Sequence, residues 1–241
     1  MTKPLGIIIG PGEGLGRALA AKFAGQGFDL ALVSRSEKNC AHAIAAVEEN
    51  SGTARFFSAD VTQPQTVESA VADIYQRMGE VRLLIYNVRG RFDSCRPLDM
   101  TYEALEKIYQ EEVVGAFAAA KAVLPNMIEK GQGSIFFSSA TAALRGSARF
   151  PLYAIGKFGL RALSQSLAKA YAVNGIHVAH FRIDCNLDVP VMKELFGSEY
   201  DPENFADPDD VAQTYWLTFQ QPKSAWSNEV EIRPYTEEWT Y

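Results

Sequence analysis

Tyr153 and Lys157 are the residues whose types and spacing most directly suggest chemistry in this chain. The stretch that contains them has helical spacing, and side chains four positions apart lie on one face of a helix. A lysine ammonium beside a phenol favours the phenolate, so we expect the pKa of Tyr153 to fall from about 10 toward neutrality. The pair therefore predicts a side chain that donates and accepts a proton at physiological pH.

Two further hydroxyl groups come just before this helix, because Ser138 and Ser139 end the preceding apolar run. In an open α/β sheet, ligands bind at the carboxyl ends of the strands. A serine pair at the end of a strand therefore belongs to the part of such a fold where chemistry is expected.

A glycine-rich loop near the start of the chain predicts a site for a pyrophosphate. The apolar run at 5–9 is typical of a strand buried on both faces of a parallel sheet, and Gly10, Gly14 and Gly16 follow it. Glycines let the backbone approach a ligand closely, and the helical spacing after them directs free N–H groups to the same point. A second strand-like run at 29–33 completes the strand–loop–helix–strand context of a dinucleotide-binding fingerprint.

Strand-like and helix-like segments alternate along the whole chain. After the first strand, the expected strands are 30–33, 55–58, 81–86, 134–137, 177–183 and 229–233, and the expected helices are 38–50, 64–78, 100–129, 152–173 and one that starts at Asp207-Pro208. This alternation predicts an α/β fold with a doubly wound parallel sheet, a Rossmann fold. No repeat or linker divides the sequence, so residues 1–241 are expected to form a single domain for dinucleotide binding and catalysis, with a substrate loop at about 189–206.

The residues after the second strand bear on the choice of cofactor. NAD-preferring enzymes usually carry an Asp or Glu there for the ribose hydroxyls, whereas this chain has Ser34 and Arg35. A guanidinium binds a phosphate through two hydrogen bonds, so this pair favours the 2′-phosphate of NADP. A solvated loop arginine is the alternative, and Glu13 stands where NADP-dependent proteins often have a basic residue, so NAD remains possible.

The G-x-x-x-G-x-G spacing of the loop, the Tyr153/Lys157 pair and the preceding serines resemble the short-chain dehydrogenase/reductase family over nearly the whole chain. Asp60-Val61 after the third strand resembles the family as well. After the fourth strand, Asn87 matches a family position, although Asn87-Val88-Arg89-Gly90 stands in place of the common Asn-Asn-Ala-Gly. The resemblance implies that Tyr153 is the catalytic acid/base, that Lys157 lowers its pKa and binds the nicotinamide ribose, and that Ser139 hydrogen-bonds the substrate oxygen. Ser138 and Thr141 are alternatives to Ser139.

The resemblance also implies a binding site for the dinucleotide. Asp60 and Val61 would hold the adenine amine, and Asn87 would stabilise the central strands beside the adenosine ribose. The cofactor-binding residues expected in this way are Gly10, Gly14, Leu15, Gly16, Ser34, Arg35, Asp60, Val61, Asn87, Val88, Tyr153 and Lys157.

Two segments depart from the family pattern in ways that matter for the chemistry. Where the family has a catalytic Asn in the long helix, three residues before a Gly, this chain has Glu112. A glutamate there could hold a proton-relay water, or its charge could perturb Lys157. After the sixth strand, the usual Pro-Gly is Asp184-Cys185 and the later Thr is Val189.

Composition limits the partners. A net charge of −6 and an isoelectric point near 5.2 argue against nucleic acid and anionic membranes as partners. No apolar run approaches the length of a membrane span. The three cysteines are far apart and lack metal-ligand spacing, so we expect no metal site and a reducing, cytoplasmic location.

These patterns predict an NADP(H)-dependent oxidoreductase that interconverts a carbonyl and an alcohol on a small molecule. The alternative is a dinucleotide-binding sensor or scaffold with little turnover, which Glu112 and Asp184-Cys185 favour.

A homodimer or homotetramer is expected through 100–129 and 152–173, unless the alanines at 116, 118–120 and 122 pack against the sheet instead. Five arginines follow the fourth and fifth strands: Arg89, Arg91, Arg96, Arg145 and Arg149. They either attract an anionic substrate, which Arg145 or Arg149 would contact, or are solvated loop charges or partners of Asp93 and Asp99.

Overall fold

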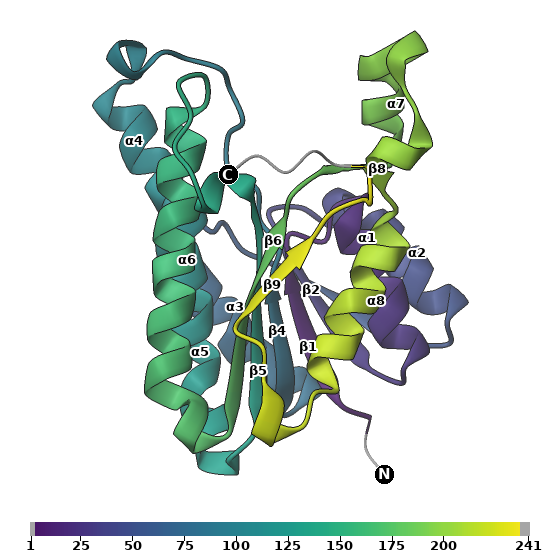
Figure 1. Ribbon diagram of the computed structural model, residues 1–241. Helices are drawn as coiled ribbons and strands as arrows, with labels where there is room; N and C mark the ends of the chain where they lie inside the picture. Colours follow the sequence, from purple (N-terminus) through teal and green to yellow (C-terminus); the bar gives the residue numbers. More distant parts are fainter. Residues whose placement is uncertain (1–2, 237–241) are drawn as a thin grey trace.

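Seven parallel strands form the central sheet of the computed structural model, which describes residues 3–236 (Figure 1). Residues 1–2 and 237–241 of the expected 1–241 domain lie outside the described part. The strand order is β3-β2-β1-β4-β5-β6-β9. The strands are β1 (Leu5–Ile9), β2 (Asp29–Ser34), β3 (Ala54–Ser58), β4 (Val81–Tyr86), β5 (Gly133–Ala140), β6 (Ile176–Ile183) and β9 (Glu229–Ile232). The doubly wound α/β fold is therefore confirmed.

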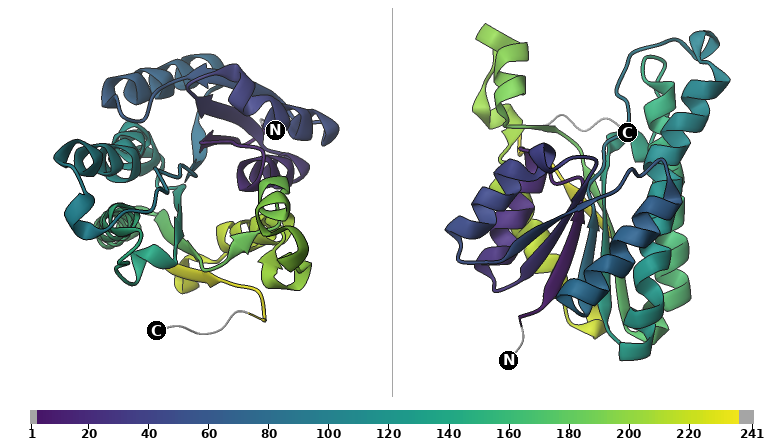
Figure 2. Two further views of the ribbon diagram at one scale, coloured as in Figure 1. Left: turned by 90° about the horizontal axis from the view of Figure 1, so that it is seen from above. Right: turned by 180° about the vertical axis from the view of Figure 1, so that it is seen from behind.

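Helices cover both faces of this sheet (Figure 2). One layer contains α1 (Leu15–Gly25), α2 (Ala41–Glu49) and α8 (Pro208–Phe219); the other contains α3 (Pro64–Met78), α4 (Tyr102–Tyr109), α5 (Gly115–Lys130) and α6 (Pro151–Tyr171). The sheet is apolar on both sides because successive side chains of a strand point to opposite faces. In β1, Ile7 and Ile9 belong to the core under α3, α5 and α6, whereas Ile8 belongs to the core under α1, α2 and α8.

The long helix expected at 100–129 is interrupted. A π-helical turn at Gln110–Val114 separates α4 from α5 and turns the side chains of Glu112 and Val113 into the interior. Single π-turns inside helices occur frequently at functional sites. The irregularity therefore brings a carboxylate to the part of the fold where the chemistry is expected.

The segment expected as the substrate loop has structure of its own. It contains α7 (Pro190–Phe196), two short 3₁₀ turns and β8 (Phe205–Ala206), which pairs with β7 (Asn186–Leu187). Figure 1 shows α7 rising above the carboxyl ends of the strands on one side, while α4 and the loop before it rise on the other. The carboxyl edge of the sheet therefore lies between two projections, the α7 arm (188–204) and the α4 arm (91–109).

Candidate active site

Two adjoining cavities lie at the carboxyl ends of the strands. Cavity A, of about 290 Å³, lies over β1, β2, β3 and β4, and cavity B, of about 390 Å³, extends from the α1 N-terminus to the ends of β5 and β6. Residues common to both linings are Gly10, Gly12, Asn87, Val88 and Arg89. The strand order reverses between β1 and β4, which is where open α/β sheets bind their ligands.

The glycine loop lines both cavities, and its backbone packs closely against its neighbours. Gly10 has a φ of +82°, and a Cβ atom there would lie 2.8 Å from the carbonyl oxygen of Asn87. A Cβ atom on Gly16 would lie 2.6 Å from the backbone of Pro11. Both positions therefore require glycine, and the loop brings the N-terminus of α1 to the floor of cavity B, which Gly14, Leu15 and Gly16 line.

The residues after β2 and β3 line cavity A. Ser34 and Arg35 lie on one side of it and Asp60 and Val61 on another. Oδ1 of Asp60 accepts hydrogen bonds from the backbone N–H and the hydroxyl of Thr62, at 2.9 and 2.8 Å, and the first of these lowers the pKa of the Asp60 carboxyl. The carboxyl is therefore ionised at neutral pH.

Asn39, Thr62 and Glu111 also line cavity A and were not expected from the sequence. Asn39 donates a hydrogen bond to the hydroxyl of Ser34 at 3.2 Å, and Thr62 supports Asp60. The Asp-x-Thr spacing of Asp60 and Thr62 is a local turn signal that the sequence could have provided. Asn39, in contrast, reaches Ser34 through the 3₁₀ turn at Glu37–Cys40, which shows no motif.

Asn87 connects β4 to the glycine loop. Its side chain Nδ2 donates to the carbonyl oxygen of Gly10 at 2.9 Å, and its backbone N–H donates to Ile9 at 2.8 Å. These bonds hold the ends of β1 and β4 in register, which is the stabilising position expected for this residue.

Ser139, Tyr153 and Lys157 all line cavity B. The exposed fractions of the three residues are 6%, 8% and 2%, so each reaches the cavity from the protein interior. Within residues 3–236, the hydroxyl of Ser139 is buried and has no hydrogen-bond partner. Such a group is costly unless a ligand satisfies it.

The two alternatives to Ser139 are already engaged. The hydroxyls of Ser138 and Tyr215 share a buried hydrogen bond of 2.8 Å. The hydroxyl of Thr141 donates to the carboxylate of Asp184. Ser139 therefore offers the hydroxyl that is available for a substrate oxygen.

Glu112 forms a buried ion pair with Lys157. Its Oε2 lies 2.8 Å from Nζ of Lys157, and its Oε1 accepts a hydrogen bond from the backbone N–H of Gly90 at 2.7 Å. The ammonium of Lys157 also donates to the carbonyl oxygens of Ser138, at 3.2 Å, and Val88, at 3.4 Å. Of the two roles left open for Glu112, the geometry shows direct contact with the lysine.

This ion pair changes the expected electrostatics. Burial raises the pKa of the Tyr153 phenol; Lys157 lowers it, but Glu112 raises it again, so the pKa lies above its usual value. Burial lowers the pKa of Lys157, but the adjacent Glu112 carboxylate outweighs this and raises it. The expected fall in the pKa of Tyr153 toward neutrality is therefore wrong, because burial of the phenol and the charge of Glu112 together outweigh the charge of Lys157.

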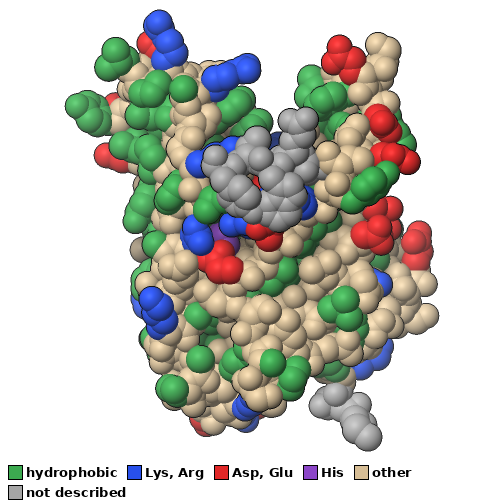
Figure 3. Space-filling view, in the orientation of Figure 1, with side chains coloured by type: hydrophobic (Ala, Val, Ile, Leu, Met, Phe, Trp, Pro, Cys, Tyr) green, Lys and Arg blue, Asp and Glu red, His purple; other side chains and the backbone are tan. Residues whose placement is uncertain are grey.

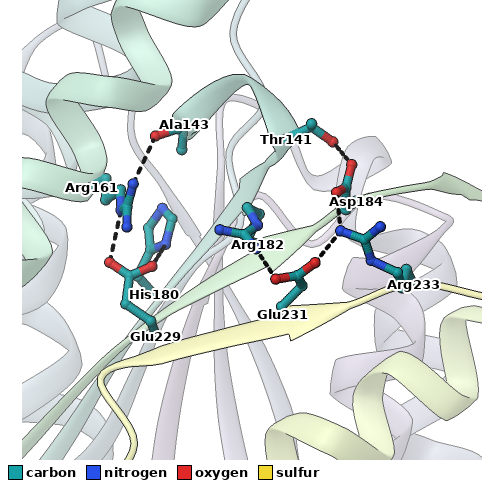
Figure 4. A network of polar contacts seen from close by, with 9 residues as sticks. All are labelled: Thr141, Ala143, Arg161, His180, Arg182, Asp184, Glu229, Glu231 and Arg233. Atoms are coloured by element: carbon teal, nitrogen blue, oxygen red, sulfur yellow. Dashed lines mark hydrogen bonds and ion pairs between the residues drawn. The ribbon is translucent and has the colours of Figure 1, made fainter. Parts of the chain in front are cut away.

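The segment after β6 lies only partly in the site. Cys185 and Val189 line cavity B. Asp184 points instead toward the C-terminal strand, where it accepts a hydrogen bond from Thr141 and lies 2.6 Å from Nη2 of Arg233 (Figure 4). Arg233 also pairs with Glu231 of β9. The aspartate thus joins the loop after β5, the end of β6 and the end of β9.

The sequence of this chain matches one family over most of its length. The profile of the short chain dehydrogenase family matches residues 6–184. The chain belongs to the short-chain dehydrogenase/reductase family. This is a family of oxidoreductases.

Individual relatives agree with this membership. A short-chain dehydrogenase/reductase from Armillaria gallica is 30% identical over 178 residues, which cover 73% of this chain and 68% of the relative. The crystal structure of a short-chain dehydrogenase from Rhodopseudomonas palustris has 32% identity and a TM-score of 0.82, and the match covers 96% of this chain and 99% of that one.

A more distant structure shares the fold. L-sorbose reductase from Gluconobacter frateurii, complexed with NADPH and L-sorbose, has a TM-score of 0.86 at 20% identity; the match covers 97% of this chain and 96% of that one.

The described residues contain neither a cluster of metal ligands nor a membrane-spanning helix. Within 3–236, no group of three or more His, Cys, Asp or Glu side chains is arranged to hold a metal ion. Across the same residues, every helix is too short or too polar to span a bilayer.

Proposed function

We propose that this protein is an NADP(H)-dependent oxidoreductase that interconverts a carbonyl and an alcohol, with Tyr153 as the acid/base. The observation that carries the proposal is the buried, unpartnered hydroxyl of Ser139 in the same cavity as Tyr153 and Lys157. A complete proton-transfer set around one cavity is difficult to explain without catalysis. The experiment that tests the proposal is the transfer of deuteride to a carbonyl compound from NADPH labelled at C4 of the nicotinamide.

The residues present fit a nicotinamide dinucleotide. The glycine loop permits the close approach that a pyrophosphate needs at the N-terminus of α1. Asp60 and Val61 would hold the adenine. Asn87 and Val88, which line both cavities, would contact the part of the dinucleotide between its two bases, and Lys157 would bind the nicotinamide ribose. L-sorbose reductase, which shares this fold, was crystallised with NADPH. When bound, the nicotinamide would supply or accept the hydride.

In this proposal the protein positions the substrate oxygen and moves one proton. Ser139 donates a hydrogen bond from its hydroxyl to the substrate oxygen. Tyr153 gives its phenolic proton to that oxygen during reduction and takes a proton from the alcohol during oxidation. Lys157 and Glu112 form a buried ion pair with each other, and their charges influence the pKa of the phenol.

Arg35 is expected to determine the preference for NADP. Arg35→Ala should weaken NADPH binding by about 1.5–3 kcal/mol, the range for charge-assisted hydrogen bonds, and leave NADH binding nearly unchanged. Fluorescence titration of both cofactors measures this. Lys38→Ala is the matched control, because Lys38 lies on the neighbouring turn and does not line cavity A. Tighter binding of NADH than of NADPH by the unmodified protein contradicts the assignment.

The alternative function, a dinucleotide sensor or scaffold, has one observation in its favour. Glu112 engages the ammonium of Lys157 and opposes the activation of Tyr153. A protein of this second kind binds NADPH but shows no transfer of hydride to any carbonyl compound.

Self-association is expected through α4, α5 and α6, but not through the alanines suggested by the sequence. Ala116, Ala118, Ala119 and Ala120 are buried against the sheet, and Ala122 is half-buried, so the alternative of internal packing is correct for the first four. Larger apolar side chains are exposed on these helices instead: Tyr109, Phe117, Ile155 and Phe158.

We propose a homodimer or homotetramer through these four side chains. Light scattering at micromolar concentration should give a mass above that of one chain, and Phe117→Glu with Phe158→Glu should reduce it to the monomer mass, because burying a charge in an apolar interface is unfavourable. A monomer in the unmodified protein contradicts the proposal.

A further inference from the structure

Two loops meet beside Tyr153 and form an aromatic wall. The backbone N–H of Cys95, after β4, donates to the carbonyl oxygen of Arg149, after β5, at 2.9 Å. Across this contact the rings of Phe92 and Phe150 stack, with centroids 4.4 Å apart and planes 5° from parallel. Phe92 also meets the ring of Tyr153 edge-on at 5.0 Å. The wall therefore touches the proposed acid/base directly.

The arginines of these loops differ in how they are neutralised. Arg91 pairs with Asp93 at 2.6 Å and Arg96 with Asp99 at 2.8 Å, so pairing with loop aspartates is the correct account of these two. Arg145 also interacts with another group, so no role in binding an anion is assigned to it.

The other two arginines of these loops are Arg89 and Arg149. Neither forms an ion pair with a carboxylate of residues 3–236. The guanidinium carbon of Arg89 lies 5.8 Å from the ring centroid of Phe92, and that of Arg149 lies 5.8 Å from the ring centroid of Phe150. The stacked rings are thus accompanied by two positive charges.

Arg89 places a positive charge at the cavity that Tyr153 lines. It lines cavity A and cavity B, and its charge opposes the rise that burial causes in the pKa of the Tyr153 phenol. Figure 3 shows basic and acidic side chains together on the α4 arm, whereas acidic side chains edge the α7 arm across the opening. An anion that enters between the arms is therefore attracted to the side of Arg89 and Arg149.

We propose that Arg89 and Arg149, with Phe92 and Phe150, bind the anionic group and the apolar body of the substrate, so that the protein acts on an oxo acid or hydroxy acid with an aromatic or aliphatic body. The inference rests on the proposed function and names its substrate class. The anionic group is a substrate carboxylate rather than a cofactor phosphate, because the proposed function assigns the pyrophosphate to the N-terminus of α1 and the 2′-phosphate to Arg35.

The first test compares one oxo acid with its neutral ester. Reduction of benzoylformate and of methyl benzoylformate by NADPH is followed in the unmodified protein and in Arg89→Gln, Arg149→Gln and Arg91→Gln. The ratio of kcat/KM for acid to ester should exceed one in the unmodified protein and fall at least about tenfold in Arg89→Gln or Arg149→Gln, the loss expected for one charge-assisted hydrogen bond. Arg91→Gln, whose guanidinium is already paired, should leave the ratio unchanged. A preference for the ester, or an unchanged ratio in both variants, overturns the proposal.

A binding measurement separates this proposal from the proposed function. Calorimetric titration of benzoate into the protein saturated with NADP⁺ needs no turnover, and affinity should fall at least about tenfold in Arg89→Gln or Arg149→Gln. Such a fall in a protein that reduces no carbonyl compound supports the anion site and rejects the oxidoreductase. Absence of benzoate binding in the unmodified protein overturns the site. Weaker NADPH binding by Arg89→Gln, with benzoate binding unchanged in both variants, assigns Arg89 to a cofactor phosphate and also overturns it.

Discussion

Replacing Tyr153 by phenylalanine is expected to abolish turnover and to leave the affinity for NADPH nearly unchanged. The change removes only the phenolic hydroxyl, and the ring, which is buried beside Phe92, remains in place. General acid–base catalysis contributes about 10²–10⁴-fold, so we expect a loss of at least that size in kcat. Steady-state kinetics on any carbonyl substrate, together with an NADPH titration, measure both quantities.

The matched variant is Lys157→Ala, which should reduce both turnover and NADPH affinity. Its ammonium contacts Glu112 and two backbone carbonyls, and it is also the group proposed to bind the nicotinamide ribose. Full turnover in Tyr153→Phe would exclude the tyrosine as the acid/base, whatever the lysine variant does.

Replacing Glu112 by glutamine is expected to shift the pH dependence of both directions to lower pH. Glu112 raises the pKa of Tyr153 and of Lys157, so removing its charge lowers both. Reduction needs the protonated phenol and falls as the pH rises through the pKa of Tyr153; in the variant this fall should occur at lower pH. Oxidation needs the phenolate and rises through the same pKa, so this rise should also begin at lower pH. Rate profiles in both directions measure the shift.

A stability measurement accompanies this variant. Breaking a buried ion pair costs about 3–5 kcal/mol, and Glu112→Ala should reduce the free energy of unfolding by about that amount. Glu112→Gln should cost less, because its amide oxygen can still accept the hydrogen bond from Gly90. Unchanged pH profiles in a folded Glu112→Gln protein would show that the carboxylate does not act on Tyr153.

Local signals in the sequence predicted most of the fold. The helix at 64–78 and the strand at 81–86 have the expected bounds, because Pro64 favours the first turn of a helix and Gly79, with a φ of +100°, ends it. The π-turn at Gln110–Val114 was not predicted, since its five residues have ordinary helical composition. Nor was α7 predicted, nor β8, which depends on pairing with β7.

The candidate site was predictable where its residues are close in sequence. Tyr153 and Lys157 share one helix, and the glycine loop follows one strand. The choice of Ser139 over Ser138 depends on Tyr215, which is 77 residues from Ser138. The direct pairing of Glu112 with Lys157 likewise depends on how α6 packs against the π-turn. These contacts arise from tertiary packing, for which a single sequence contains no local signal.

The most direct test of the central claim is the transfer of deuterium from NADPH that is doubly deuterated at C4 of the nicotinamide. The protein is incubated with this cofactor and with a panel of aldehydes, ketones and oxo acids, and the products are analysed by mass spectrometry. Our account predicts an alcohol with one deuterium on the former carbonyl carbon, formed by the unmodified protein and not by Tyr153→Phe. A protein that binds NADPH but transfers no deuterium to any member of the panel would contradict it and favour a sensor or scaffold.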